Sequence, residues 1–298
     1  MCSTQTLATL GDLKMIILDY SQMAISSFMA EAARNKTENE ELNVDLFRHM
    51  ILNVIRSYRT RFIDKYGDVV IACDNRHYWR KREYPFYKAN RRKARDESKW
   101  DWESIFDAIA IVKQELSENF PYPVIDVDGA EADDVIGTLA EYTTDPFLIV
   151  SGDHDFKQLQ RFPHVEQYAP AQKKFVTINE PAEQVLLEHI IKGDRGDGIP
   201  NMLSSDNCLV EGKRQRPIRK KLLAEWKTTP PEEWVSNAEM AHGFTRNQKL
   251  IDLTKTPDTI KENIIHSYES QKNQDRESVL PYLQERGLKA LVYVSNEF

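Results

Sequence analysis

Four short apolar runs, each ending in an aspartate, constrain the fold of this 298-residue chain more than any other feature. Their length and their content of β-branched residues are typical of buried strands. The runs are Met15–Asp19, Val69–Asp74, Pro123–Asp128 and Phe147–Asp153. Apolar residues at helical spacing fill the stretches between them, at 41–66, 100–120 and 135–142. Strands that alternate with helices predict an α/β fold, with a central, mostly parallel sheet flanked by helices on both faces.

The pattern changes after residue 155. Residues 165–168 and 175–178 predict a hairpin, and residues 180–298 predict mainly helix with no further central strand. We therefore expect an α/β domain over residues 1–180 and a helical region over 181–298. Residues 76–99 and about 201–217 are polar and weakly periodic, which favours mobile segments.

The composition excludes several classes of protein. No stretch approaches the roughly 18 apolar residues of a membrane helix, and the N-terminus lacks the features of a signal peptide. The three cysteines are far apart and form no CxxC motif, which favours a reducing compartment. Neither a GxGxxG nor a Walker motif is present.

Basic residues are concentrated in two segments, although the net charge of the chain is −7. Residues 76–99 hold ten Lys and Arg against three acids, and residues 212–221 hold six bases and no acid. Such a distribution favours a polyanion held at defined places over a general polyanion binder. A solvated helix face is the alternative for each segment. Five aromatic residues in the first segment favour stacking on nucleic-acid bases: Tyr78, Trp79, Tyr84, Phe86 and Tyr87.

Acidic residues follow the predicted strands at the edge where parallel sheets collect ligands. Nine carboxylates could meet there: Asp19, Asp74, Glu131, Asp133, Asp134, Asp153, Asp155, Asp194 and Asp197. Each alone is a common helix-capping or turn residue, but together they would repel one another unless divalent cations neutralised them. Because we expect no His or Cys to converge with these oxygens, the set favours Mg²⁺ or Mn²⁺, and two ions are plausible. His154 is expected to face solvent or to support the ligands.

Five segments together resemble the ordered motifs of the 5′-nuclease, or flap endonuclease, superfamily. They are ILDYS (17–21), the strand ending at Asp74, EADD (131–134), SGDHDFKQL (151–159) and GDRGDGIPN (193–201). The resemblance covers essentially the whole chain. It implies a PIN-like nuclease domain followed by a helix–three-turn–helix region.

The resemblance also implies a cofactor of two Mg²⁺ ions, for which Mn²⁺ can substitute. It places five acids at the first ion: Asp19, Asp74, Glu131, Asp134 and Asp153. It places three at the second: Asp155, Asp194 and Asp197. Asp133 belongs to the same acidic triplet, at a position where some relatives lack an acid.

The basic segment 76–99 matches the arch under which a single strand passes in this family. Lys88 and Arg91 match phosphate-facing catalytic cations, and Tyr87 matches an aromatic near the scissile nucleotide. The further residues expected to contact nucleic acid are Arg80, Lys81, Arg82, Arg92, Lys93, Gly196, Gly198, Lys213, Arg214, Arg216, Arg219 and Lys220. Gly198 stands where many relatives carry Asn.

The implied activity is that of a Mg²⁺-dependent 5′→3′ exonuclease and flap endonuclease with ribonuclease H activity. Its substrates would be RNA–DNA hybrids, duplex DNA with a 5′ end, flaps and forks, and its role the removal of lagging-strand primers. The implied protein is a monomer encoded by a phage and acting in the host cytoplasm, with a single-strand DNA-binding protein and a sliding clamp as partners. Two alternatives stay open: a PIN-type endoribonuclease specific for single strands, and a non-catalytic junction-binding protein.

Overall fold

A six-stranded sheet forms the centre of the computed structural model, which describes residues 13–35 and 43–298 except the side chains of 34, 35 and 92–94. The strand order is β3-β2-β1-β4-β5-β6, with β1 to β5 parallel and β6 antiparallel to β5. The predicted α/β class is confirmed. The strands are β1 Met15–Asp19, β2 Asp68–Ala72, β3 Val124–Ile125, β4 Phe147–Val150, β5 Val165–Ala169 and β6 Lys174–Phe175.

Two details of the sheet differ from expectation. The third strand pairs over only two residues, because the chain leaves the sheet before Asp126. The predicted hairpin is present, but its first strand is also a parallel member of the central sheet, beside β4.

Helices and 3₁₀ turns make up most of the remaining described chain. They are α1 Tyr20–Asn35, α2 Val44–Tyr66, α3 Trp79–Glu83, α4 Ala89–Asp96, α5 Trp102–Asn119, α6 Ala132–Tyr142, η1 Asp155–Arg161, α7 Ala182–Lys192, α8 Lys220–Thr228, α9 Pro231–Trp234, α10 Ala238–Ile251, η2 Leu253–Lys255, α11 Asp258–Gln271, α12 Val279–Glu285, α13 Lys289–Val292 and η3 Ser295–Glu297. The predicted start of α2 at residue 41 lies outside the described residues.

Local signals delimit the two longest helices. The side chain of Asn43 accepts a hydrogen bond from the Leu46 amide and caps α2, and Gly67 ends that helix with a positive φ of 72°. Asp101 caps α5 by accepting from the Ser104 amide. No described helix combines the length and apolarity needed to cross a membrane.

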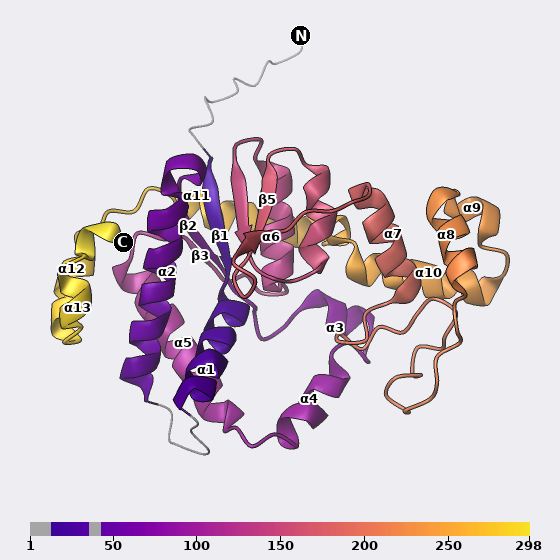
Figure 1. Ribbon diagram of the computed structural model, residues 1–298, viewed down its shortest axis with the longest axis horizontal. Coiled ribbons are helices and arrows are strands. Elements are labelled where there is room, and N and C mark those ends of the chain that lie inside the picture. Colours follow the sequence, from indigo (N-terminus) through magenta and orange to yellow (C-terminus); the bar gives the residue numbers. More distant parts are fainter. Residues whose placement is uncertain (1–12, 36–42) are drawn as a thin grey trace, which may run out of the picture.

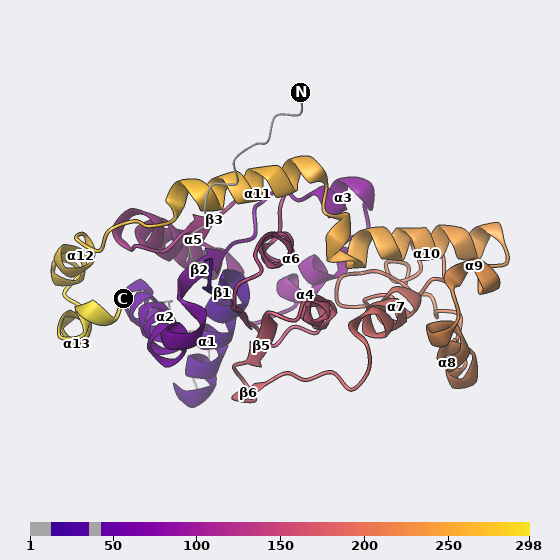
Figure 2. The same cartoon turned by 90° about the horizontal axis from the view of Figure 1, so that it is seen from above.

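Both faces of the sheet are covered, which explains why the strands are continuously apolar. Ile16 and Leu18 face α2 and α5, while Ile17 faces α6 and α11. The two helical layers lie on either side of the sheet in Figure 2.

The chain returns to the first domain after forming a separate helical lobe. Helices α7 to α10 form the lobe at the right of Figure 1, with a small core that includes Met202, Trp226 and Met240. Helix α11 then runs back along the sheet, and α12 and α13 pack on α2 and α5. The last residue, Phe298, is fully buried in that core. The C-terminal helices therefore share the hydrophobic core of the sheet domain.

The basic segment 76–99 spans the carboxyl edge of the sheet. It carries α3 and α4 and passes below the strands in Figure 1. Backbone bonds hold it at two points: the Trp79 amide donates to Gly129 O over 2.9 Å, and the Lys88 amide donates to Asp197 O over 2.8 Å. The segment thus bridges the loop before α6 and the turn that follows α7.

Candidate metal centre

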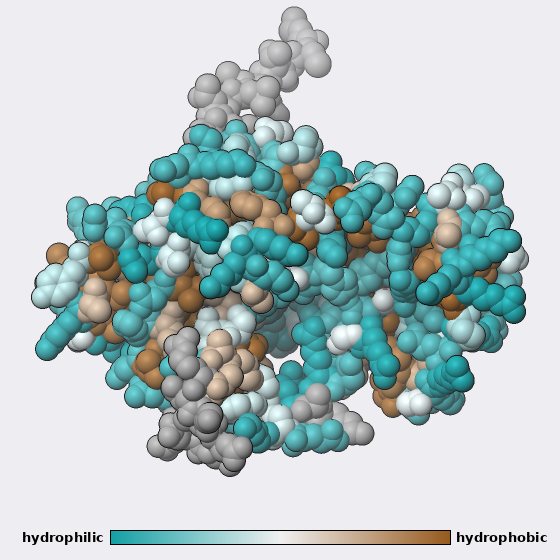
Figure 3. Space-filling model, viewed as in Figure 1, coloured by the Kyte–Doolittle hydropathy of each residue, from teal (hydrophilic) through white to brown (hydrophobic). Residues whose placement is uncertain are grey.

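Seven of the nine predicted acids converge at the carboxyl edge of the sheet. Parallel pairing sets β1 beside β2 and β4 in register, so the residues that follow these strands share one edge. A cleft there is lined by Asp19, Asp74, Asp133, Asp153, Asp155, Asp194 and Asp197 together with Lys88 and Arg91. Figure 3 shows hydrophilic surface in the hollow between the main body and the α7 lobe.

Electrostatic repulsion within this cluster perturbs its members. Burial, followed by the neighbouring charges of Asp74 and Asp153, raises the pKa of Asp19 to about 7. Burial, followed by the Asp153 charge, also raises the pKa of Asp133 well above its ordinary value. Such carboxylates become stable as anions when a cation lies among them.

Asp134 does not face the cluster, which contradicts its assignment to the first ion. Its oxygens accept from Arg80 Nη1 at 2.8 Å, Trp79 Nε1 at 3.1 Å and Thr256 Oγ1 at 2.6 Å. The side chain is 0% exposed, and the Arg80 charge helps to hold its pKa below the ordinary value. Asp133 instead lines the cleft. Adjacent residues at a helix start point about 100° apart, so only one of the two can face the ions.

Arg80 is an internal counterion and not a nucleic-acid contact. The residue is 2% exposed. Its Nε donates to Leu250 O over 2.8 Å, and its Nη1 donates to both Glu131 and Asp134. The sequence could not distinguish Arg80 from its neighbours Lys81 and Arg82, because only the folded structure buries Arg80 and leaves the other two exposed.

The arch is tied to the acids by three side chains. Lys88 Nζ donates to Glu131 over 2.6 Å and lies 3.5 Å from Asp197, and Arg91 also pairs with Asp197. The Tyr87 hydroxyl donates to Asp197 over 2.8 Å and to Glu131 over 3.1 Å. Because Tyr87 is buried, its ring is not free to stack on a nucleotide in this structure, contrary to expectation.

Both carboxylate oxygens of Glu131 therefore accept hydrogen bonds from side chains of the arch. Oε1 accepts from Lys88, and Oε2 accepts from Arg80 and Tyr87. In this structure Glu131 positions the arch cation and does not line the acidic cleft.

The glycine-rich turn 193–201 joins the arch to α7. Asp194 Oδ1 accepts from the Asp197 amide over 3.0 Å, which orders the turn. Gly198 has a φ of 75°, and a Cβ atom there would lie 2.8 Å from Phe86 O. Close approach of the arch backbone, as well as the positive φ, therefore requires glycine at this position. Gly196 lines the cleft.

Two histidines join the cluster, although the sequence analysis expected none. His154 Nε2 lies 3.4 Å from both Asp155 Oδ1 and Asp194 Oδ2, and His189 contacts the same two carboxylates. Hydrogen bonds to Asp153 and then Asp194 raise the pKa of His154 to about 10. The position of His189, one helical turn before the glycine-rich turn, was the available sequence signal.

The second basic segment lies on the surface of the lobe. Lys213 pairs with Glu211, and Arg216 pairs with Glu239. Within the described part of the chain, Arg214, Arg219 and Lys220 are exposed and form no ion pair. Asn201 holds the two ends of segment 201–217 together. Its backbone amide donates to Gln215 Oε1 over 2.6 Å, and its side-chain amide donates to the Arg216 carbonyl over 2.8 Å. The side chains of Arg92 and Lys93 lie outside the described residues.

The donor set fits divalent metal ions. The Oδ1 atom of Asp155 is shielded from solvent and has no hydrogen-bond partner among the described residues, as expected of an atom that takes a ligand. Its pKa is raised to about 6, first by burial, so the free anion is costly there. A cation at this place would satisfy both the orphaned oxygen and the surrounding charge.

Comparison with known proteins gives consistent matches along the chain. Residues 14–186 match the model of the 5′-3′ exonuclease, N-terminal resolvase-like domain, and residues 181–298 match the T4 RNase H, C-terminal model. The chain is 33% identical to Ribonuclease H of Enterobacteria phage T4 over 293 residues, which cover 95% of each protein. It is 30% identical to a 5′-3′ exonuclease of Streptomyces coelicolor over 151 residues, which cover 45% of this chain and 50% of that protein.

Solved structures show the same fold at lower sequence identity. A bacteriophage T5 flap endonuclease in complex with DNA and metal ions gives a TM-score of 0.58 at 16% identity, covering 87% of this chain and 99% of that one. The T5 5′-exonuclease with bound zinc gives 0.57 at 14% identity, covering 86% and 97%. At this identity the likeness concerns the fold alone.

Proposed function

The chain belongs to the 5′-3′ exonuclease family and is a nuclease, and on that premise we propose that it is a Mg²⁺-dependent 5′→3′ exonuclease and flap endonuclease with ribonuclease H activity. One observation carries the proposal. Seven carboxylates from separate parts of the chain line one cleft, opposite two cations of the arch.

The residues present suit two ions of the kind that activate water and stabilise a leaving oxygen in phosphodiester hydrolysis. Asp19, Asp74, Asp133 and Asp153 would hold one ion. Asp155, Asp194 and Asp197 would hold the other.

Lys88 and Arg91 would contact the scissile phosphate. Both now pair with Asp197 of the cleft, so an entering phosphate would exchange one anionic partner for another. Their charge would then balance the negative charge that develops on the phosphate oxygens. Glu131 would keep Lys88 in position through its 2.6 Å contact. The expected products are a 5′-phosphate and a 3′-hydroxyl.

The lobe would hold duplex nucleic acid. The exposed basic side chains of residues 213–220 and the glycine-rich turn offer contacts to the nucleic-acid backbone. Such contacts carry no sequence information. We therefore propose substrates defined by shape: RNA–DNA hybrids, duplex DNA with a 5′ end, flaps and forks. In this proposal the nuclease is a monomer that removes lagging-strand primers in the cytoplasm of a phage-infected host, alongside a single-strand DNA-binding protein and a sliding clamp. Residues 1–180 supply the catalytic domain and 181–298 the duplex-binding region.

Neither alternative accounts for the whole molecule. A PIN-type endoribonuclease acting on single strands has no use for the exposed basic lobe, and a junction-binding protein has no use for seven clustered acids. We therefore favour the exonuclease and flap endonuclease proposal over both alternatives.

A labelled, nicked and flapped RNA–DNA duplex tests the proposal. We expect cleavage from the 5′ end with Mg²⁺ and none with chelator. Asp155→Asn should abolish turnover and leave duplex binding largely intact. Asp126→Asn is the matched control, because this acid also follows a strand but bonds Asn75 and Lys113 outside the cleft. Binding without cleavage would favour the junction-binding protein, and cleavage confined to unpaired RNA would favour the PIN-type enzyme.

A further inference from the structure

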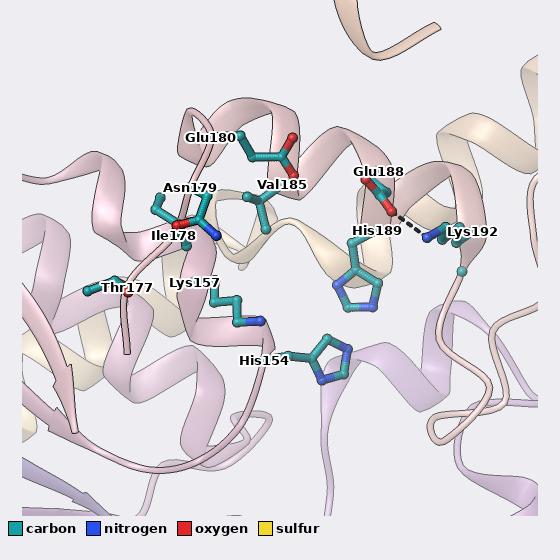
Figure 4. A pocket seen from close by; sticks show the side chains of 11 residues that line it. His154, Lys157, Thr177, Ile178, Asn179, Glu180, Val185, Glu188, His189 and Lys192 are labelled. Carbon is teal, nitrogen blue, oxygen red and sulfur yellow. Dashed lines mark hydrogen bonds and ion pairs between the residues drawn. The ribbon is translucent and has the colours of Figure 1, made fainter. Parts of the chain in front are cut away.

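The second half of the acidic cleft contains imidazole nitrogens as well as oxygens. His154, Asp155, His189 and Asp194 each offer one ligand atom, and these atoms lie within 4.8 Å of one another. They come from three places in the chain: the start of η1, where His154 precedes Asp155, the last turn of α7, and the glycine-rich turn. Figure 4 shows the two imidazoles projecting from separate elements into one pocket.

We propose that these four residues form a mixed imidazole–carboxylate site that binds a borderline transition-metal ion, such as Zn²⁺, Co²⁺ or Mn²⁺, in preference to Mg²⁺. The proposal deepens the proposed function, on which it rests, because it concerns the ligands of the second ion.

Three of the six separations among the donor atoms fit such an ion. The N–O separations are 3.4 Å for His154–Asp155, 3.4 Å for His154–Asp194 and 3.4 Å for His189–Asp155. In a tetrahedral site with metal–ligand distances of about 2.1 Å, neighbouring ligand atoms lie about 3.4 Å apart.

Asp155 and His189 have surroundings that are typical of metal ligands. Asp155 Oδ1 has no hydrogen-bond partner among the described residues although it is shielded from solvent. His189 Nδ1 faces Asp155, while its Nε2 lies 3.2 Å from Asp194. Both ring nitrogens of His189 therefore face carboxylates of the proposed site.

The site is open to an incoming ion. The two rings lie 4.7 Å apart, centroid to centroid, and the His154 side chain is 58% exposed. Lys157, Glu188 and Lys192 line the same pocket, which leads from solvent to the imidazoles (Figure 4).

Imidazole donors change which ion the site prefers. Mg²⁺ takes oxygen ligands in near-ideal octahedral geometry, whereas imidazole suits Zn²⁺ and its neighbours in the transition series. The remaining acids of the cleft offer oxygen only, so the two halves of the cleft would differ in selectivity.

Co²⁺ titrated into the metal-free, full-length protein tests the site without reference to catalysis. We expect one equivalent to produce the intense visible absorption of four-coordinate Co²⁺, which excess Mg²⁺ leaves in place and Zn²⁺ removes. His154→Gln and His189→Gln should each weaken Co²⁺ binding beyond the roughly 10- to 100-fold typical of losing a second-shell partner. The double variant should lose the absorption.

His242→Gln is the matched control. This histidine also pairs with an aspartate, Asp206, and its side chain is 65% exposed, but it lies outside the cluster. It should leave the absorption unchanged. Circular dichroism checks that each variant is folded, and if the double variant is not, His154→Gln decides, because its exposed ring contributes little to packing.

The outcomes separate this inference from the proposed function. Only the weak absorption of six-coordinate Co²⁺, or an intense band that survives in the histidine variants, would overturn the mixed site even if the flapped duplex is cut with Mg²⁺. A histidine-dependent band without cleavage by any ion would leave the site standing and overturn the nuclease proposal.

Discussion

Arg80 Nη1 lies 2.8 Å from Asp134 Oδ2, and both side chains are excluded from solvent. The pair joins the start of the arch to the first turn of α6, beside the acidic cleft. Arg80 also pairs with Glu131 over 2.9 Å, so one buried arginine neutralises both acids.

Removing the arginine should destabilise the protein strongly. Arg80→Ala leaves buried Asp134 without its cation and Glu131 with Lys88 alone, and breaking a buried pair typically costs about 3–5 kcal/mol. Urea denaturation measures the loss. Arg82→Ala, on the exposed side of the same helix, should change stability by less than about 0.5 kcal/mol. Equal effects of the two variants would contradict the buried role of Arg80.

Adjacent acids of α6 should respond oppositely to amidation. Asp134→Asn removes the charge that pairs with Arg80 and turns one of the two accepting oxygens into a donor, so it should lower the unfolding free energy by a few kcal/mol. Asp133→Asn relieves repulsion in the cleft, so stability should hold or rise while Mg²⁺ affinity and turnover fall. Calorimetric titration with Mg²⁺ and thermal unfolding distinguish the two. The reverse result would restore Asp134 as the ligand.

The raised pKa of Asp19 predicts a pH-dependent effect in metal-free protein. Its value of about 7 in the fold exceeds the ordinary 3.8, so folding favours the protonated form, and this carboxyl costs stability as pH rises from about 4 through 7. Asp19→Asn should therefore raise the free energy of unfolding at pH 8 by at most about 4 kcal/mol and have little effect at pH 4. Melting temperatures at the two pH values measure the difference. Saturating Mg²⁺ should shrink or reverse the gain at pH 8. An equal gain at both pH values would show that charge is not the cause.

Gly198 should tolerate a methyl group less well than a matched glycine. Gly198 and Gly212 both have positive φ, at 75° and 65°, but a Cβ atom at 212 would meet nothing within 4 Å. Gly212→Ala should cost only the backbone strain, about 1 kcal/mol. Gly198→Ala should cost more and reduce turnover, because it pushes the Phe86 carbonyl and hence Lys88 away from the cleft. Cleavage rates and melting temperatures of both variants check this.

The exposed basic side chains of the lobe should contribute to duplex affinity but not to the rate of the cleavage step. Replacing Arg214, Arg219 and Lys220 by alanine should weaken duplex binding at low salt and reduce the salt slope of log K by up to about 0.9 per lost phosphate contact. Single-turnover cleavage at saturating enzyme should be little changed. An unaltered salt slope would place the duplex elsewhere on the molecule.

Local patterns in the chain determined most of the sheet and the members of the acidic cleft. Runs such as Met15–Asp19 are buried on both faces, and that burial is visible as unbroken apolarity. The parallel arrangement then brings Asp19, Asp74 and Asp153 to one edge whatever the detailed packing. Their meeting follows from strand direction alone, so sequence was sufficient.

Tertiary structure alone decided which charges face the cleft and which partners they have. Arg80 bonds a carbonyl 170 positions away at Leu250, and His189 reaches Asp155 from another element, contacts that no local period encodes. Asp133 and Asp134 are chemically identical in sequence, and only the rotation of α6 against Arg80 separates them. The return of the chain to bury Phe298 is likewise set by the long-range fit of apolar surfaces, because burial free energy depends on area removed from water and not on sequence distance.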